Sequence, residues 1–399
     1  MKRIICILLS IILLLPANFT ALAQIATEYY SEDLTANTDA TVYASTEPQT
    51  EGLYTVLMEK NTKTVLSESG AHESRAPASI TKIMSLLLIM EAIEKGKLTL
   101  ETTITASEHA CSMGGSQIWL EPGEEMSVHD LLKAVVVASA NDATVALGEA
   151  VSGSEEAFVD AMNKKAATLK MEDTHFVNCS GLDAEGHVSS AYDIAVMSCE
   201  LMKYDLIKKY TTIWMDTLRN GTSELVNTNK LVRFYSGATG LKTGTTSEAG
   251  FCVSATAQKD GMELCAVVLG ASNNDERFGT AKKLLNYGFA NYKTKTITKS
   301  QINSVTLKVE GGTKDTVVAV PSGDINCLIS SSEDGEVTFD TTSHGTVKAP
   351  IAKGQKLGTV TVKLKNKELG MVDLVANTTI EALTYKKVVI CLIKSLFTL

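Results

Sequence analysis

The 399-residue chain lacks the sequence signatures of several large functional classes. Its six histidines form no H-x-H or H-E-x-x-H string, and its eight cysteines include no C-x-x-C pair. These absences argue against a metal centre and against a dithiol redox site. Basic residues are in the minority, with 37 Lys and Arg against 46 Asp and Glu, and no basic tract suits nucleic acid. We therefore expect no metal, no cofactor and no nucleic-acid partner.

The N-terminus carries an apolar run that is too short to span a bilayer. Lys2 and Arg3 precede residues 4–15, which are apolar apart from one serine, and an Ala-Leu-Ala string at 21–23 offers small residues for cleavage. This arrangement predicts a signal peptide over residues 1–23 and disfavours a retained anchor. Cleavage removes two positive charges and takes the formal net charge from −9 to −11, so we expect an acidic, exported protein.

The cysteines do not suggest a disulfide framework. Loss of the signal peptide removes Cys6 and leaves an odd number. Cys252 and Cys265 are the one tempting pair, because they flank a predicted hairpin that turns at 260–261. In that register Cys265 faces residue 255 or 256, and Cys252 lies about three residues, roughly 10 Å, along the strand. This separation is too large for a disulfide bond.

Composition divides the remainder of the chain into segments. Residues 24–48 are small and polar without a helical or strand period, which predicts a loose leader. Residues 49–292 combine long apolar stretches with alternating segments, whereas residues 300–383 are rich in Val, Thr and Gly with recurrent turn signals. We therefore expect an α/β domain followed by a small all-β domain.

Periodicity predicts the main elements of the first domain. Residues 80–98 are apolar on nearly every face, which is typical of a buried central helix, and the Asp-Gly pair at 260–261 is a strong hairpin signal. The expected elements are strands at 52–58 and 63–67, helices at 80–98, from 128 towards 153, at 155–169 and at 280–287, and a strand pair at 251–257 and 262–269.

The first of three short strings with chemical potential is S-x-x-K. Ser79 and Lys82 are three residues apart at the start of the buried helix, so the serine hydroxyl is expected beside the lysine amine. A serine hydroxyl needs a base to become a nucleophile, and burial lowers a lysine pKa as that role requires. A lysine that extends to solvent is the alternative, and it does not explain the two strings that follow.

The second string is Ser-Ala-Asn at 139–141, where two polar side chains interrupt the predicted second helix. Buried polar groups need partners. In the functional interpretation Ser139 hydrogen-bonds the Lys82 amine and relays a proton to the leaving group, while Asn141 binds a substrate amide. A helix cap or a hydrogen bond between helices is the alternative.

The third string is Lys-Thr-Gly at 242–244, which leads into the hairpin. A strand edge at this position can pair with an extended peptide. Lys242 and Thr243 would then meet the carboxylate of that peptide, and Gly244 would let the two backbones approach closely.

Together these strings resemble the S-x-x-K, S-x-N and K-T-G pattern of the serine-type D-Ala-D-Ala carboxypeptidases, the low-molecular-mass penicillin-binding proteins. The resemblance covers about residues 50–292, with further matching strings at 181–187 and 189–193. It implies a serine β-lactamase/transpeptidase-like fold with an antiparallel sheet between helices. It also implies removal of the terminal D-alanine from peptidoglycan pentapeptide stems, and covalent inhibition by β-lactams.

The resemblance further implies roles for individual residues. Ser79 would be the acylated nucleophile, Lys82 its base, and Ser139 with Asn141 the second catalytic element. The backbone N–H groups of Ser79 and Thr245 would form the oxyanion hole.

Carboxylate binding is the point at which the chain departs from the family pattern. Arg277 aligns with a family arginine near the substrate's terminal carboxylate, with a solvated surface arginine as the alternative. Thr228 stands where some members carry a second arginine. The resemblance therefore assigns the carboxylate to Lys242, Thr243 and Arg277.

Residues 385–399 form a distinct last segment in which a narrow stripe with Lys387 and Lys394 interrupts apolar residues. As a helix this segment is about 22 Å long, short of the roughly 30 Å of a bilayer core. We predict a basic amphipathic helix in the membrane interface, at the outer face of the bacterial cytoplasmic membrane. A helix packed on the β domain is the alternative.

Two other functions remain for comparison. A class A β-lactamase would need an E-x-x-x-N string downstream of the second motif, and residues 172–176 lack it. A catalytically idle penicillin sensor or cell-wall-binding protein is the second alternative, against which the intact Ser79, Lys82, Ser139 and Lys242 argue. The sequence leaves carboxypeptidase and transpeptidase activity unseparated, because both pass through the same acyl-enzyme.

Overall fold

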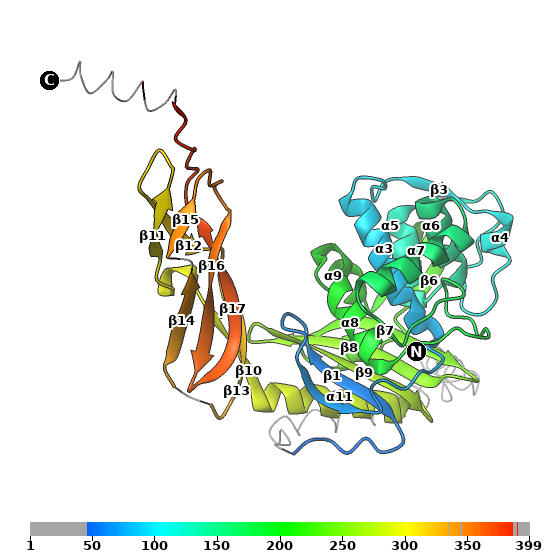
Figure 1. The fold of residues 1–399 in the computed structure, drawn as a ribbon. Coiled ribbons are helices and arrows are strands. Elements are labelled where there is room, and N and C mark those ends of the chain that lie inside the picture. The colour runs from blue at the N-terminus through cyan, green and yellow to red at the C-terminus, as the bar shows by residue number, and fades with distance from the viewer. Residues whose placement is uncertain (1–45, 334, 344, 386–388, 390–399) are drawn as a thin grey trace, which may run out of the picture. The chain divides into compact units, whose positions relative to one another are not determined.

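The computed structural model describes residues 46–333, 335–343, 345–385 and 389. The predicted signal peptide, most of the predicted leader and nearly all of the predicted C-terminal helix lie outside the described residues. The described residues form a domain of helices around a sheet, followed by an all-β domain (Figure 1).

The first domain is built on a five-stranded antiparallel sheet in the order β2-β1-β9-β8-β7. Its strands are β1 (Tyr54–Glu59), β2 (Val65–Ser69), β7 (Ala238–Thr246), β8 (Gly250–Lys259) and β9 (Met262–Ala271). Both predicted strand pairs are thus present. Asp260 and Gly261 form the β8–β9 turn with φ of 49° and 81°, the left-handed conformation that a two-residue hairpin favours.

The hairpin register agrees with the one deduced from the sequence. Cys265 pairs with Thr256, and Cys252 pairs with Gly244 on the other side of β8. Within the described part of the chain, the cysteines are free thiols.

Helices and two short ribbons complete the first domain. The helical elements are η1 (Ala78–Thr81), α3 (Lys82–Glu94), α4 (Glu108–Cys111), α5 (Val128–Lys133), the π-helical η2 (Ala134–Ala138), α6 (Asn141–Ser152), α7 (Glu155–Thr168), α8 (Ala191–Leu201), α9 (Asp205–Thr211), η3 (Arg219–Gly221), α10 (Leu231–Phe234) and α11 (Asn274–Asn291). The ribbons pair β3 (Thr103–Thr105) with β4 (Glu125–Ser127), and β5 (Met215–Leu218) with β6 (Ser223–Val226).

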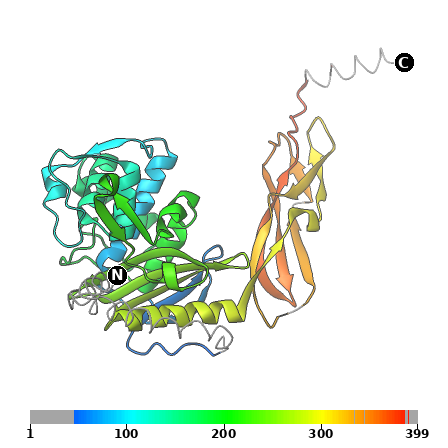
Figure 2. The ribbon, with the colours of Figure 1, turned by 180° about the vertical axis from the view of Figure 1, so that it is seen from behind.

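Alternating side chains of the sheet fill two separate cores. Val56 and Met58 of β1 pack with the buried residues of α3, α6 and α8, whereas Leu57 packs with Leu284 and Leu285 of α11. Figures 1 and 2 accordingly show α11 on the opposite side of the sheet from α3, α6 and α8. The predicted antiparallel sheet between helices is confirmed.

The predicted second helix is wrong in one respect, because it is not continuous. The π-helical η2 ends at Ser139, whose φ of 63° is left-handed, and α6 begins anew at Asn141. The reason is tertiary: the Asn141 N–H donates to the Ser116 carbonyl at 2.7 Å, and its side-chain amide donates to the Gly114 carbonyl at 2.6 Å. Hydrogen bonds to a distant loop thus replace those of a continuous helix.

The second domain is all β, as predicted. A six-stranded sheet has the order β14-β16-β17-β12-β11-β15, and β10 pairs with β13. The elements are β10 (Tyr292–Ile297), η4 (Lys299–Gln301), β11 (Val305–Glu310), β12 (Thr316–Pro321), β13 (Ile325–Ser330), β14 (Val337–Ser343), β15 (Thr346–Lys348), β16 (Lys356–Leu364) and β17 (Lys367–Ala376). The first of these strands lies ahead of residue 300, where composition alone suggested the domain to begin.

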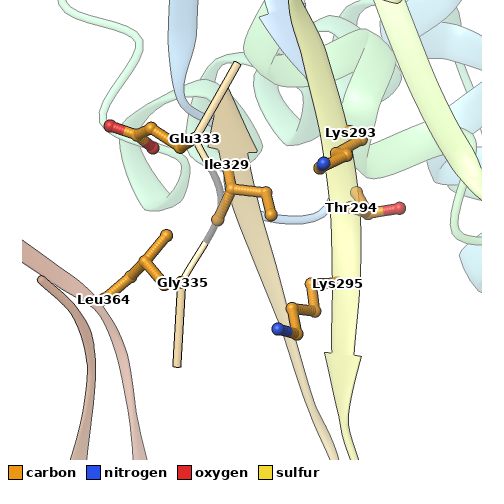
Figure 3. Close-up of a pocket in the computed structure, with 7 residues that line it drawn as sticks. All are labelled: Lys293, Thr294, Lys295, Ile329, Glu333, Gly335 and Leu364. Carbon is orange, nitrogen blue, oxygen red and sulfur yellow. The ribbon is translucent and has the colours of Figure 1, made fainter. Parts of the chain in front are cut away.

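A cavity of about 210 Å³ lies within the second domain (Figure 3). It is lined by Lys293, Thr294, Lys295, Ile329, Glu333, Gly335 and Leu364. Figure 3 shows the Thr294 hydroxyl on the opposite side of β10 from the amines of Lys293 and Lys295. Because this cavity brings no nucleophile to a base, it is not the candidate active site.

Packing of α11 on the sheet predicts a large stability loss for Leu284→Ala. The side chain is fully buried, so its truncation should lower the free energy of unfolding by about 2–5 kcal/mol through lost transfer energy and the cavity left behind. The neighbouring exposed Lys283→Ala is the matched control and should stay within about 0.5 kcal/mol of the unmodified protein. Denaturant unfolding measures both, and equal effects would contradict the assigned packing.

Candidate active site

The predicted nucleophile of the first motif, Ser79, stands on a sharp backbone turn. Ser79 lies in η1, which leads directly into α3, and Ala78 before it has a φ of 47°, a left-handed conformation that is costly for a residue with a Cβ. The turn packs closely on Gly181, where an added Cβ would lie 1.9 Å from the Ala78 carbonyl oxygen. The strained turn is thus held in place by a neighbouring loop.

Lys82 lies where the three-residue spacing predicted. Its Nζ donates to Ser79 Oγ at 3.0 Å, to Asn141 Oδ1 at 2.5 Å and to the Ser180 carbonyl at 2.6 Å. The side chain is fully buried, and this burial lowers the pKa of Lys82 to about 7, against the opposing influence of the Asp142 carboxylate. An amine with this pKa can take up and release a proton near neutrality.

Ser139 contacts a different lysine from the one we predicted. Its Oγ accepts a hydrogen bond from Lys242 Nζ at 2.9 Å, while Lys82 uses Asn141 as its partner in this motif. The break after η2 accounts for the difference, because it places Ser139 outside the regular helix. Burial, followed by the charges of Lys82 and Arg277, holds the pKa of Lys242 well below its usual range.

Asn141 also differs from expectation. We predicted that it binds a substrate amide, yet in this structure its side chain donates to the Gly114 carbonyl and accepts from Lys82. The structure thus shows Asn141 as a hydrogen-bond partner of the lysine amine.

Gly244 brings β7 against the nucleophile turn. An added Cβ would lie 3.0 Å from Ser79 N, from Ala78 Cβ and from the Pro77 carbonyl oxygen. We predicted a close approach at this glycine between the protein and a substrate backbone, and the structure shows one between two segments of the protein itself. Thr245 follows directly, so its backbone lies near that of Ser79. Among the residues that the structure describes, β7 is also the last strand of its sheet, and its outer edge pairs with no other strand.

Arg277 is buried beside the third motif, so the alternative of a solvated surface arginine is wrong. Its Nη1 donates to the Gly244 carbonyl, to Thr245 Oγ1 and to the Cys252 carbonyl at 3.1–3.2 Å. Burial lowers the pKa of Arg277 to about 10, and its Nε has no hydrogen-bond partner within the described part of the protein. On the other side of the motif, Thr243 Oγ1 donates to Thr228 Oγ1 at 2.7 Å.

The sequence analysis did not predict the role of His187, which links the loop around Ser180 to the turn that carries Ser79. His187 Nε2 lies 2.8 Å from Thr81 Oγ1, and its Nδ1 accepts from the Val177 N–H at 2.9 Å. Burial lowers the pKa of His187 to about 4, so the ring is neutral near pH 7. The string at 181–187 matched the family pattern, but nothing in its spacing pointed to Thr81.

No group of three His, Cys, Asp or Glu side chains capable of holding a metal ion occurs among the described residues. The ionisable groups that meet at the three motifs are Lys82, Lys242 and Arg277, together with the hydroxyls of Ser79 and Ser139.

The family described as D-alanyl-D-alanine carboxypeptidase matches residues 41–273, and the C-terminal domain of penicillin-binding protein 5 matches residues 292–382. The chain belongs to the D-alanyl-D-alanine carboxypeptidase family. It is 47% identical to the D-alanyl-D-alanine carboxypeptidase DacF of Bacillus subtilis over 312 residues, covering 77% of this chain and 80% of that protein. The predicted enzyme class is thereby confirmed.

Structural comparison supports the same assignment. Penicillin binding protein 5 from Haemophilus influenzae matches 84% of this chain and 99% of its own, with a TM-score of 0.75 and 30% sequence identity. Penicillin-binding protein D2 from Listeria monocytogenes, in its cefotaxime-bound form, matches 61% of this chain and 100% of its own, with a TM-score of 0.56 and 30% identity. The predicted fold class is confirmed.

The buried amine predicts how carboxypeptidase activity depends on pH. Because burial lowers the pKa of Lys82 to about 7, the neutral amine becomes abundant only above this pH. The kcat/KM for a small D-Ala-D-Ala peptide should rise with pH through neutrality and fall about tenfold per pH unit on the acidic side. Lys82→Arg should be almost inert throughout, since a guanidinium cannot accept a proton in this range. A flat profile, or an active arginine variant, would contradict the base assignment.

Proposed function

We propose that this enzyme removes the terminal D-alanine from peptidoglycan stem peptides through a covalent ester on Ser79. The observation that carries the proposal is the 3.0 Å separation of Ser79 Oγ from Lys82 Nζ, an amine whose pKa burial lowers to about 7. A serine next to such a base has the activation that nucleophilic catalysis requires.

In the first step neutral Lys82 takes the proton of Ser79, and Oγ attacks the carbonyl carbon of the penultimate D-alanine. The backbone N–H groups of Ser79 and Thr245 stabilise the negative charge that develops on the carbonyl oxygen. Support for this pairing comes from Gly244, whose Cα approaches Ser79 N closely enough that a Cβ would lie 3.0 Å from it.

In the second step the peptide C–N bond breaks, and the departing D-alanine amine needs a proton. Ser139 is suited to deliver it, because its hydroxyl is held by Lys242 at 2.9 Å. It donates its proton to the amine and is reprotonated by Lys242, and Lys82 passes the proton that it took from Ser79 to Lys242 through solvent, so Lys82 is neutral again. Water then attacks the ester, gives one proton to Lys82 and releases the shortened peptide, and Ser79 regains its proton.

The terminal carboxylate of the substrate requires cationic and hydroxyl donors. Lys242 and Arg277 supply two buried positive charges, and Thr243 supplies a hydroxyl. Thr243 donates to Thr228 in the structure, so substrate binding would redirect this hydrogen bond to the carboxylate. We also propose that β-lactams acylate Ser79, in keeping with the cefotaxime-bound form of the Listeria relative.

Ser79→Ala tests the nucleophile. This variant should lose both D-alanine release from a D-Ala-D-Ala peptide and covalent labelling by a fluorescent penicillin, because no acyl ester can form. Ser300→Ala, at an exposed serine of the second domain, is the control and should retain both. Labelling of the Ser79→Ala variant at the rate of the unmodified protein would place the nucleophile elsewhere.

We further propose that residues 385–399 hold the enzyme on the outer surface of the cytoplasmic membrane. The sequence of this segment supports the proposal, since it combines an apolar surface with Lys386, Lys387 and Lys394, which anionic lipid attracts. In the described part of the protein, no helix has the length and apolar character needed to cross a membrane.

Truncation after Ala382 tests this location. The full-length mature protein should sediment with vesicles that contain anionic lipid, whereas the truncated protein should stay in solution and keep its activity on a small D-Ala-D-Ala peptide. Replacing the three lysines by glutamate should weaken binding to the same vesicles. Equal partitioning of full-length and truncated protein would show that the segment is no anchor.

A further inference from the structure

Trp119 is a large apolar side chain that the protein leaves in water. It is 75% exposed, whereas its neighbours Ile118 and Leu120 are 6% and 5% exposed. The neighbours anchor the loop in the core of the first domain, so Trp119 is not needed for that purpose. An exposed indole also gains little hydrophobic stabilisation in the free protein.

The backbone at Trp119 is strained as well. Its φ of 59° is left-handed, a conformation that is a genuine outlier for a bulky residue. Such a conformation persists only where the surroundings enforce it, and an observed outlier of this kind points to function.

The buried carboxylate of Asp142 is one group that holds Trp119 in its left-handed conformation. Its Oδ2 accepts the backbone N–H groups of Ile118 at 3.1 Å and of Leu120 at 3.0 Å. These two donors flank Trp119, so a single carboxylate fixes the backbone on both sides of the exposed residue. Asp142 follows directly after Asn141 of the second motif.

The second group is the guanidinium of Arg219. It donates to the carbonyl of Ile118 at 2.9 Å and to the carbonyl of Trp119 at 3.2 Å. Glu124 holds the guanidinium in turn, with Nε to Oε1 at 2.8 Å and Nη2 to Oε2 at 3.0 Å. The backbone donors and acceptors around Trp119 are therefore tied to charged side chains from α6 and η3.

This loop is joined to the catalytic groups through Asn141. The Asn141 N–H donates to the Ser116 carbonyl at 2.7 Å, and its side chain accepts from Lys82, which lies 3.0 Å from Ser79 Oγ. Few contacts therefore separate the Trp119 loop from the nucleophile. Ser116, three residues before Trp119, is thus joined to Ser79 through Asn141 and Lys82 by three consecutive hydrogen bonds.

We infer that Trp119 is a binding platform for the part of the stem peptide that precedes D-Ala-D-Ala. An indole offers a wide apolar face to aliphatic side chains. It loses little conformational entropy on binding, and this loss is smaller still where the backbone is already fixed. The inference rests on the proposed function and adds a specificity-determining residue to it.

Trp119→Ala tests the platform with two substrates. On a stem pentapeptide, L-Ala-D-Glu-L-Lys-D-Ala-D-Ala, we expect kcat/KM to fall about tenfold, mainly through KM. On acetyl-D-Ala-D-Ala, which lacks the upstream residues, we expect less than about a twofold change. Trp119→Phe should recover most of the loss. Met371→Ala, at a 62% exposed residue of the second domain, is the control and should act as the unmodified enzyme does on both substrates.

Fluorescence gives a readout that does not depend on turnover. The chain has two tryptophans, so Trp214→Phe leaves Trp119 as the sole indole. In a Ser79→Ala, Trp214→Phe protein, addition of the pentapeptide should shift the Trp119 emission, and acetyl-D-Ala-D-Ala should leave it unchanged.

A stability measurement separates the platform from a structural role. Trp119→Asn places a residue that tolerates the left-handed conformation at this position, so the thermal midpoint should rise while pentapeptide activity falls. A lower midpoint would show that the indole stabilises the loop by packing and would overturn the inference.

The kinetic outcomes are also distinct. Equal losses on the two substrates, or no loss on either, would overturn the platform while the proposed function stands. A loss confined to glycan-bearing muropeptides would assign the indole to sugar and overturn the peptide assignment. If the unmodified enzyme released D-alanine from none of these substrates, the proposed function would be contradicted. The shift in Trp119 emission would still report on the platform in that case.

Discussion

The buried amine of Lys82 is the group on which the architecture of the site depends. A charged amine without water needs partners, and Lys82 takes them from three separate segments: Ser79 of η1, Asn141 of α6 and the carbonyl of Ser180. The same contacts that satisfy the amine therefore bring the nucleophile turn, the second motif and the 180 loop together. Because burial also lowers the pKa of Lys82 to about 7, the side chain that organises the site is also the base of the proposed mechanism.

The third motif adds a second buried cation from the sheet. Lys242 reaches Ser139, and Arg277 comes from α11 on the far face of the sheet to contact the Gly244 carbonyl. Burial lowers the pKa of both Lys242 and Arg277, and for Lys242 the nearby charges of Lys82 and Arg277 lower it further. Under the proposed function, the carboxylate of a bound peptide would relieve this repulsion, which gives the proposed preference for a free C-terminus an electrostatic basis.

The elements around these groups hold them before substrate arrives. His187 links the loop around Ser180 to Thr81. Asp142 and Arg219 fix the loop that carries Trp119. Each of these residues forms hydrogen bonds with polar groups that would otherwise lack a partner. These contacts fix the loops during folding, so less conformational entropy is lost when a peptide binds.

Local pattern was sufficient for the features that depend on near neighbours in the chain. The helical spacing of Ser79 and Lys82 and the hairpin at 260–261 follow from periods and turn chemistry, whereas the sheet between helices was implied by the resemblance to the family. Contacts between distant segments were decided by the tertiary structure alone. Ser139 meets Lys242 because a loop at 114–116 breaks its helix, and Gly244 faces the nucleophile turn because η1 packs on β7. No local period encodes which distant group fills a given space, since that choice depends on how the whole core packs.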